Sequence, residues 1–174
     1  MTGTYTAQTN GLHYLTILNR RSLPPTEDVR NYIDDISLEP ATPDLTIDWA
    51  NISIATGGAS TISLDAGPGH NSEHYLLLAS FGTFPGFTMD GVAVHLNADV
   101  LFNYSLARAN TAMFQNSFGT LDASGRGQAV FDTTGPLSPV FLGRTISFAY
   151  LLLTAPGTRP VTYASLPVMV NLIP

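Results

Sequence analysis

The sequence predicts an all-β protein, an antiparallel β-sandwich of jelly-roll type with little helix. Most apolar segments alternate apolar and polar residues with a period of two, the pattern of strands that bury one face. Glycine and proline, 15 and 12 of the 174 residues, divide these segments into short stretches joined by turns, as in sandwiches and barrels. With 44% apolar and 11% charged residues, the chain can also build a hydrophobic core.

About eleven segments are predicted as strands. In order along the chain they are 12–18, 32–38, 45–49, 52–54, 61–64, 75–80, 92–96, 100–106, 128–132, 145–153 and 166–173. The segment 61–64 shows the alternation most simply, because Ile62 and Leu64 are separated by Ser63. We therefore expect one face of this strand in the core and the other in solvent.

Two segments, 75–79 and 146–153, are apolar on both faces. Such strands lie either at the centre of a sheet that is covered on both sides or in an interface with another molecule. The sequence leaves both alternatives open.

The loop 122–127, Asp-Ala-Ser-Gly-Arg-Gly, is predicted to connect two strands as a hairpin, with Gly125 or Gly127 in the left-handed conformation. Aspartates at turns, such as Asp122 and Asp90, serve the turn more often than catalysis. Neither is therefore taken as a catalytic residue.

The chain is predicted to divide near residue 41, where Pro40 and Pro43 enclose a short linker. Residues 1–40 would then be an N-terminal strand segment, too short for an ordinary core of its own, and residues 41–174 a β-sandwich domain. The segment could be the remnant of a preceding jelly roll, or it could supply strands to another sheet.

Residues 24–40 admit two interpretations. Thr26 could cap a short helix that runs to about Asp35. Alternatively, 32–38 is a strand that places Tyr32, Asp34, Ile36 and Leu38 on one face.

The basic residues exclude several functions. All seven are arginine, so the chain has no lysine for a Schiff base or a P-loop, and without cysteine it has no thiol nucleophile or disulfide. The arginines form no cluster, which argues against nucleic-acid binding.

Location is predicted from composition. No run approaches the roughly 18 apolar residues that a membrane helix needs, so no membrane span is expected. Residues 1–20 carry no secretory signal pattern. Either the protein is cytoplasmic, or its signal lies outside this chain. Low charge with abundant Thr, Ser, Asn and Gly is common in extracellular β modules and favours the second alternative, a secreted or cell-surface protein.

A histidine pair offers the main enzymatic alternative. His70, Glu73 and His74 match the H-x-x-E-H pattern, in which two histidines on one helical face bind zinc. Here a Gly-Pro-Gly turn precedes the pattern, a predicted strand follows it, and no downstream glutamate is left as a ligand. No G-x-S-x-G motif occurs either. A non-enzymatic protein is therefore expected, and a metal-dependent hydrolase ranks last.

Six stretches between about residues 52 and 173 carry a resemblance. They are Ser63-Leu-Asp-Ala-Gly67, Tyr75-Leu-Leu-Leu-Ala-Ser80, Gly82-Thr-Phe-Pro-Gly86, His95-Leu-Asn97, Gly119-Thr-Leu-Asp122 with Gly125, and 143–153. In order and spacing they resemble a module of unknown function in large secreted proteins of environmental bacteria such as planctomycetes and myxobacteria. The resemblance implies a structural or adhesive accessory at the end of an exported chain.

A second resemblance covers residues 11–40. The segments 12–18 and 32–38 resemble the closing strands of jelly-roll carbohydrate-binding modules. In such modules an acid on the closing strand often helps to hold a structural calcium, which implies Asp34 as a calcium ligand. No other cofactor is expected. The alternative is that Asp34 bonds to backbone or arginine, or is exposed.

Five aromatic residues could form a sugar-stacking platform: Trp49, Tyr75, Phe81, Phe84 and Phe87. Aromatics in strands and beside Gly/Pro turns are more often core or loop anchors, and we favour that interpretation.

Three functions follow in order of preference. The first is a non-enzymatic extracellular structural or adhesive protein that self-assembles into a filament or surface array by exchange of strands from residues 1–40, with itself or a cell-surface polymer as partner. The second is a carbohydrate-binding accessory module, favoured by a row of exposed aromatics. The third is the metal-dependent hydrolase.

Overall fold

The computed structural model describes residues 44–155 and 158–174. The predicted strands 12–18 and 32–38, the ambiguous segment 24–40 and the calcium ligand Asp34 lie outside the described residues. They stay predictions, as does the domain boundary near residue 41.

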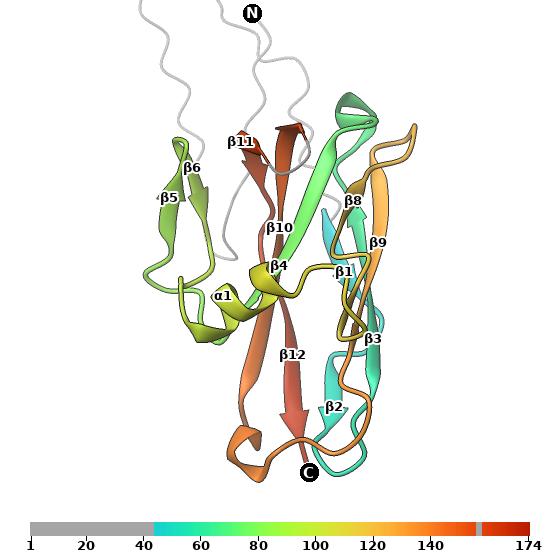
Figure 1. The fold of residues 1–174 in the computed structure, drawn as a ribbon, viewed down its shortest axis with the longest axis vertical. Coiled ribbons are helices and arrows are strands. Elements are labelled where there is room, and N and C mark those ends of the chain that lie inside the picture. Colours follow the sequence, from blue (N-terminus) through green and yellow to red (C-terminus); the bar gives the residue numbers. More distant parts are fainter. Residues whose placement is uncertain (1–43, 156–157) are drawn as a thin grey trace, which may run out of the picture. The chain divides into compact units, whose positions relative to one another are not determined.

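The described chain folds into two β-sheets and one helix, which confirms the prediction of an all-β sandwich with little helix (Figure 1). The four-stranded sheet has the order β1 (Leu45–Ile47), β3 (Ala59–Asp65), β9 (Arg126–Asp132), β7 (Phe114–Gln115). The six-stranded sheet has the order β2 (Asn51–Ser53), β12 (Val168–Ile173), β10 (Thr145–Ala155), β4 (His74–Ser80), β8 (Phe118–Thr120), with β11 (Thr158–Ala164) also paired to β10. A separate hairpin, β5 (Phe87–Met89) and β6 (Val92–Val94), precedes helix α1 (Val100–Ala107), and short 3-10 turns span Pro68–His70 and Pro139–Phe141.

Pairing in the six-stranded sheet is organised by β10. Its first half pairs with β12 and its second half with β11, while β4 lies along its other edge. These pairs are antiparallel, whereas β2 and β12 run parallel.

The main core fills the space between the sheets. Ile62 and Leu64 of β3 face inward, as their alternation with Ser63 predicts, and meet side chains of β10 and β12. Phe131 of β9 and Phe148 of β10 bring their ring centroids to 5.1 Å across this space. Burial of these apolar side chains supplies most of the stabilisation of such a sandwich.

A second core covers the other face of β10. Ala149, Leu151 and Leu153 pack there with Val94 of β6 and Phe102 of α1. Figure 1 shows α1 and the β5–β6 hairpin on the opposite side of β10 and β4 from β3 and β9. The two-sided apolar pattern of 146–153 therefore reflects a central strand covered on both faces by its own chain.

The predicted strand 100–106 is wrong, because these residues form α1. The Asp99 side chain caps the helix by accepting a hydrogen bond from the Phe102 N–H at 2.9 Å. Within the helix, Ser105 Oγ accepts a hydrogen bond from the backbone N–H of Ala79 on β4 at 3.0 Å, which fixes the helix against the sheet.

The loop 122–127 differs from the predicted hairpin. It connects β8 of one sheet to β9 of the other, so it crosses the sandwich at one end. Gly125 takes the left-handed conformation with φ +76°. This is one of the two alternatives that the sequence predicts, Gly125 or Gly127. A Cβ at Gly125 would lie 1.8 Å from the carbonyl oxygen of Gly67, so the two loops approach closely at this point.

Candidate functional site

The H-x-x-E-H residues are not arranged as a metal site. His70 Nδ1 lies 3.2 Å from Glu73 Oε2, and His74 Nδ1 lies 3.0 Å from Thr120 Oγ1 on β8. His70 ends a 3-10 turn and His74 begins β4, so no helix places the two histidines on one face. No group of three or more His, Asp or Glu side chains that could hold a metal occurs among the residues described.

The side chains of the two turn aspartates accept hydrogen bonds from backbone N–H groups. Asp122 Oδ1 accepts hydrogen bonds from the N–H groups of Arg126 and Ser124, at 3.0 and 2.7 Å, which lowers the pKa of this carboxyl. Asp90 Oδ2 accepts a hydrogen bond from the N–H of Val161 on β11 at 2.9 Å. Both residues therefore act within the fold, as their turn positions predict.

The five aromatics do not form one platform. Tyr75 is buried and its hydroxyl donates to the carbonyl of Asn116, while Phe81 and Phe87 pack against the two cores. Trp49 and Phe84 are exposed, at 67% and 87%. Three of the five aromatic residues thus anchor the core or a loop.

An apolar groove of about 330 Å³ lies beside α1 in the described part of the chain. We call it the α1 groove. Its lining comes from α1, β9, β10, β12, the segment 133–141, Phe81 directly after β4 and Met113 directly before β7. The lining residues are Phe81, Val100, Leu101, Tyr104, Met113, Phe131, Thr133, Leu137, Phe141, Ile146 and Leu172.

The α1 groove opens the main core to the surface. Phe131 and Ile146 belong to the core between the sheets, yet they also line the groove. Around it, apolar side chains are exposed: Val100 at 74%, Val140 at 67% and Leu142 at 50%. Val140 and Leu142 flank the lining residue Phe141 in the chain, and exposed apolar side chains that gather at one place mark interaction sites.

Two arginines adjoin the groove. The guanidinium carbon of Arg108 lies 5.7 Å from the ring centroid of Tyr104, and that of Arg144 lies 5.9 Å from the centroid of Phe81. Both rings line the groove. Within the described part of the chain neither guanidinium makes an ion pair, unlike that of Arg126, which contacts Asp65 at 2.9 Å.

Asp99 positions two walls of the groove. Its Oδ1 fixes the start of α1, which contributes Val100 and Leu101 to the lining. Its Oδ2 accepts hydrogen bonds from the Phe81 N–H at 2.8 Å and from Ser80 Oγ at 2.9 Å. One carboxylate thus holds the end of β4 and the start of α1 together.

The α1 groove is not evident from the sequence. Its lining residues are far apart in the chain, and each has the apolar character of an ordinary core residue. One local signal was present: Val140-Phe141-Leu142 is an apolar run inside a loop between Pro139 and Gly143, where solvent exposure is the usual expectation.

Comparison with known proteins gives no family. No protein-family model matches the chain, and no curated protein matches it. A solved structure, the ASH / PapD-like domain of human CEP192 (PapD-like domain 7), is similar with a TM-score of 0.30 and 11% identity, over 86% of this chain and 96% of that one. At this level the similarity does not bear on function. No helix in the described ranges is long and apolar enough to cross a membrane.

Proposed function

We propose that this chain is a non-enzymatic extracellular structural or adhesive module that assembles with copies of itself into a filament or array, with residues 1–40 of one copy supplying strands to the next. The observation that supports it is the α1 groove, where the core between the sheets reaches the surface without a covering segment among the described residues.

The groove favours an extended apolar occupant. Protein interiors are close-packed, and a space of about 330 Å³ leaves the surrounding side chains without part of their contacts. A strand inserts alternate side chains into such a groove and adds apolar burial with each. As an extended strand, 12–18 would place Leu12, Tyr14 and Leu18 on one face, and 32–38 would place Tyr32, Ile36 and Leu38 on one face.

Particle size tests the proposal directly. We expect light scattering and negative-stain microscopy of the full chain to show particles larger than a monomer, and a variant lacking residues 1–40 to lose them. Circular dichroism of that variant serves as the control for folding. A full chain that stays monomeric at all concentrations would refute self-assembly. Repeating the measurement with a chelator tests calcium at Asp34, since a calcium-dependent assembly would shrink.

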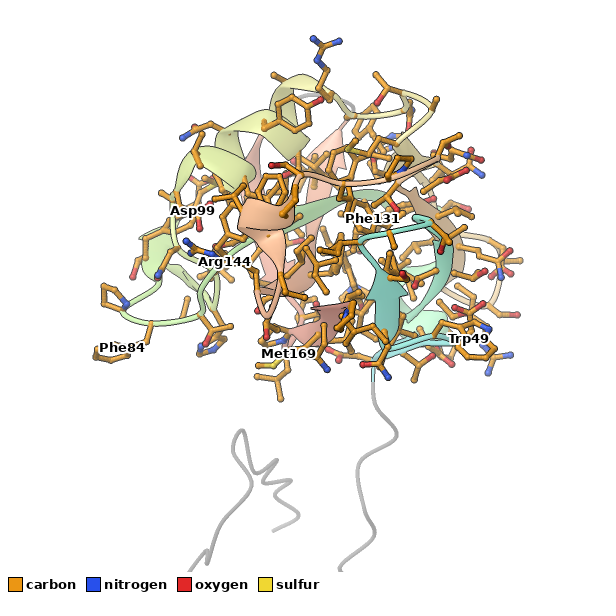
Figure 2. The ribbon with its side chains drawn as sticks, turned by 90° about the horizontal axis from the view of Figure 1, so that it is seen from below. Trp49, Phe84, Asp99, Phe131, Arg144 and Met169 are labelled. Carbon is orange, nitrogen blue, oxygen red and sulfur yellow. The ribbon has the colours of Figure 1, made fainter. Side chains whose placement is uncertain are left out.

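A carbohydrate-binding module is the second candidate, supported by one exposed side of the molecule. Figure 2 shows Trp49, Met169 and Phe84 along the same side of the view. Between strands β2 and β12, Asn171 Nδ2 lies 3.4 Å from Asn51 Oδ1. Exposed aromatic rings with nearby amides suit stacking and hydrogen bonding to sugars.

Glycan binding separates the two candidates. A carbohydrate-binding module should bind on a glycan array and lose binding in Trp49→Ala, with Val100→Ala as a control at the α1 groove. An assembling module should instead lose particle size in variants of the groove and keep it in Trp49→Ala.

A further inference from the structure

We propose that the occupant of the α1 groove is the acidic segment 32–38 of a neighbouring copy, and that Arg108 and Arg144 select it over the segment 12–18. This inference rests on the self-assembly proposed above and adds to it the identity of the donated strand. Its basis is the charge at the groove and in the two candidate segments.

Two arginine side chains lie beside the groove. The chain as a whole has a net charge of −6, yet the described arginines beside the groove, Arg108 and Arg144, contact aromatic rings and make no ion pair with a described carboxylate. Both are exposed, so their guanidinium groups remain available. A guanidinium on an aromatic face keeps its outer N–H donors free for a carboxylate.

The two candidate segments differ in charge. Residues 26–40 contain five carboxylates and one arginine, and two of those carboxylates, Asp34 and Asp35, lie within 32–38. The segment 12–18 contains no carboxylate, and Arg20 and Arg21 follow it. Opposite charges therefore favour 32–38 at this groove, and like charges disfavour 12–18.

As an extended strand, 32–38 would present three apolar side chains and one carboxylate on the same face. In an extended strand, Tyr32, Ile36 and Leu38 share a face with Asp34, at intervals of about 6.6 Å. The three apolar side chains can enter the groove while the carboxylate meets a guanidinium. Asp34 would then bind arginine, the alternative to calcium left open for it by the sequence.

A charge swap in the full-length chain tests the assignment. We expect Arg108→Glu with Arg144→Glu to raise the concentration at half-assembly by about tenfold or more, because like charges then meet at the groove. Asp34→Arg with Asp35→Arg should weaken assembly similarly. Combining all four substitutions should restore it. Arg126→Glu, away from the groove, is the control for the charge change that each single Arg→Glu substitution makes.

The outcomes separate this inference from the proposed function. If the full chain does not assemble at all, self-assembly fails and the inference with it. If the chain assembles and loses assembly without residues 1–40, but the double glutamate variant assembles like the wild type, self-assembly stands and the groove assignment is overturned. The groove assignment would also be overturned if the variant with all four substitutions failed to regain assembly while its thermal unfolding was unchanged.

Assembly of single variants identifies the strand. Tyr32→Ser with Ile36→Ser should abolish assembly, whereas Leu12→Ser with Thr16→Ser should leave it close to the wild type. If the 12–18 variant lost assembly and the 32–38 variant kept it, 12–18 would be the segment that occupies the groove. That result would contradict the proposal that Arg108 and Arg144 select 32–38.

Discussion

The rings of Tyr150 and Tyr163 lie 5.9 Å apart, but only one of their hydroxyls has a described hydrogen-bond partner. Tyr163 on β11 donates to the Asp44 carboxylate. The hydroxyl of Tyr150 on β10 is buried in the main core and has no partner among the described residues. Two adjacent tyrosines thus make opposite contributions to stability.

Removal of the two hydroxyls should separate these contributions. We expect Tyr150→Phe to raise the free energy of unfolding by about 1 kcal/mol, because it removes an unpaired buried polar group. Tyr163→Phe should lower it by about 1–3 kcal/mol, because Asp44 loses its donor. Urea titration measures both. A destabilising Tyr150→Phe would mean that its hydroxyl has a partner in the folded protein.

Alkaline pH should destabilise the fold through the same pair. Burial raises the pKa of both tyrosines, and the second cause is the charge interaction with Tyr163 for Tyr150 and the hydrogen bond to Asp44 for Tyr163. A raised folded pKa means that stability is complete below the unfolded value, about 10, and falls as pH rises beyond it. The double variant Tyr150→Phe with Tyr163→Phe should flatten this decline between pH 9 and 12 in thermal unfolding scans.

Acid should act at the loop between β8 and β9. The folded pKa of Asp122 is lowered by hydrogen bonds from the backbone of Arg126 and then of Ser124. Its contribution to stability is therefore present above the unfolded pKa, about 4, and is lost as pH falls through the folded value. We expect Asp122→Asn to be less stable than the wild type at pH 7 and to approach it at pH 2. A difference independent of pH would contradict this.

The approach of two loops should make Gly125 irreplaceable. Gly125→Ala would place a Cβ 1.8 Å from the Gly67 carbonyl oxygen at φ +76°, so it should destabilise by about 2–4 kcal/mol. Gly69→Ala is the matched control, because no atom lies within 4 Å of its ideal Cβ, and it should change stability by less than about 0.5 kcal/mol. Chemical denaturation measures the stability of both variants. Equal stabilities would exclude the close contact.

Substitutions at Asp99 should distinguish its two roles. Asp99→Ala removes the helix cap and the acceptor for Phe81, so we expect a loss of about 2 kcal/mol in unfolding free energy. Asp99→Asn keeps one side-chain acceptor for the Phe102 N–H but replaces the oxygen that binds Phe81 by a donor. It should lose about half as much. Equal losses in the two variants would show that the cap contributes little.

The sequence predicted the strands that alternate and the two strands that are apolar on both faces, and it missed elements whose structure depends on contacts with neighbouring residues. The pattern of 100–106 suits a strand, because Val100, Phe102 and Tyr104 are separated by single residues. The hydrogen bond that the Asp99 carboxylate accepts from the Phe102 N–H favours a helix, and the period of the apolar residues does not reveal this bond. A capping aspartate before an apolar run was the available signal.

β11 was missed for a different reason. Pro160 interrupts Thr158–Ala164, and a proline argues against a strand. In the structure β11 pairs only with β10, with register shifts between Leu152 and Ala155, so a residue without an N–H is tolerated at this edge.

The candidate site could not be predicted for a third reason. Phe131, Ile146 and Leu172 come from three strands in two sheets. The local sequence around each of them is that of an ordinary core strand. Only the packing of α1 and the segment 133–141 leaves a groove over them. Local sequence contains the apolar character of each side chain but not the space that remains between them.

The parallel pairing of β2 and β12 has a mechanical consequence. Hydrogen bonds join Asn171 N to Ala50 O at 2.7 Å and Ile54 N to Ile173 O at 2.8 Å, at the two ends of this pair. Tension applied between Ala50 and Ile173 would pull the two parallel strands in opposite directions along their axes. The hydrogen bonds would then be loaded together in shear and not opened one by one. Resistance to pulling is thus built into the pairing of two strands far apart in the chain.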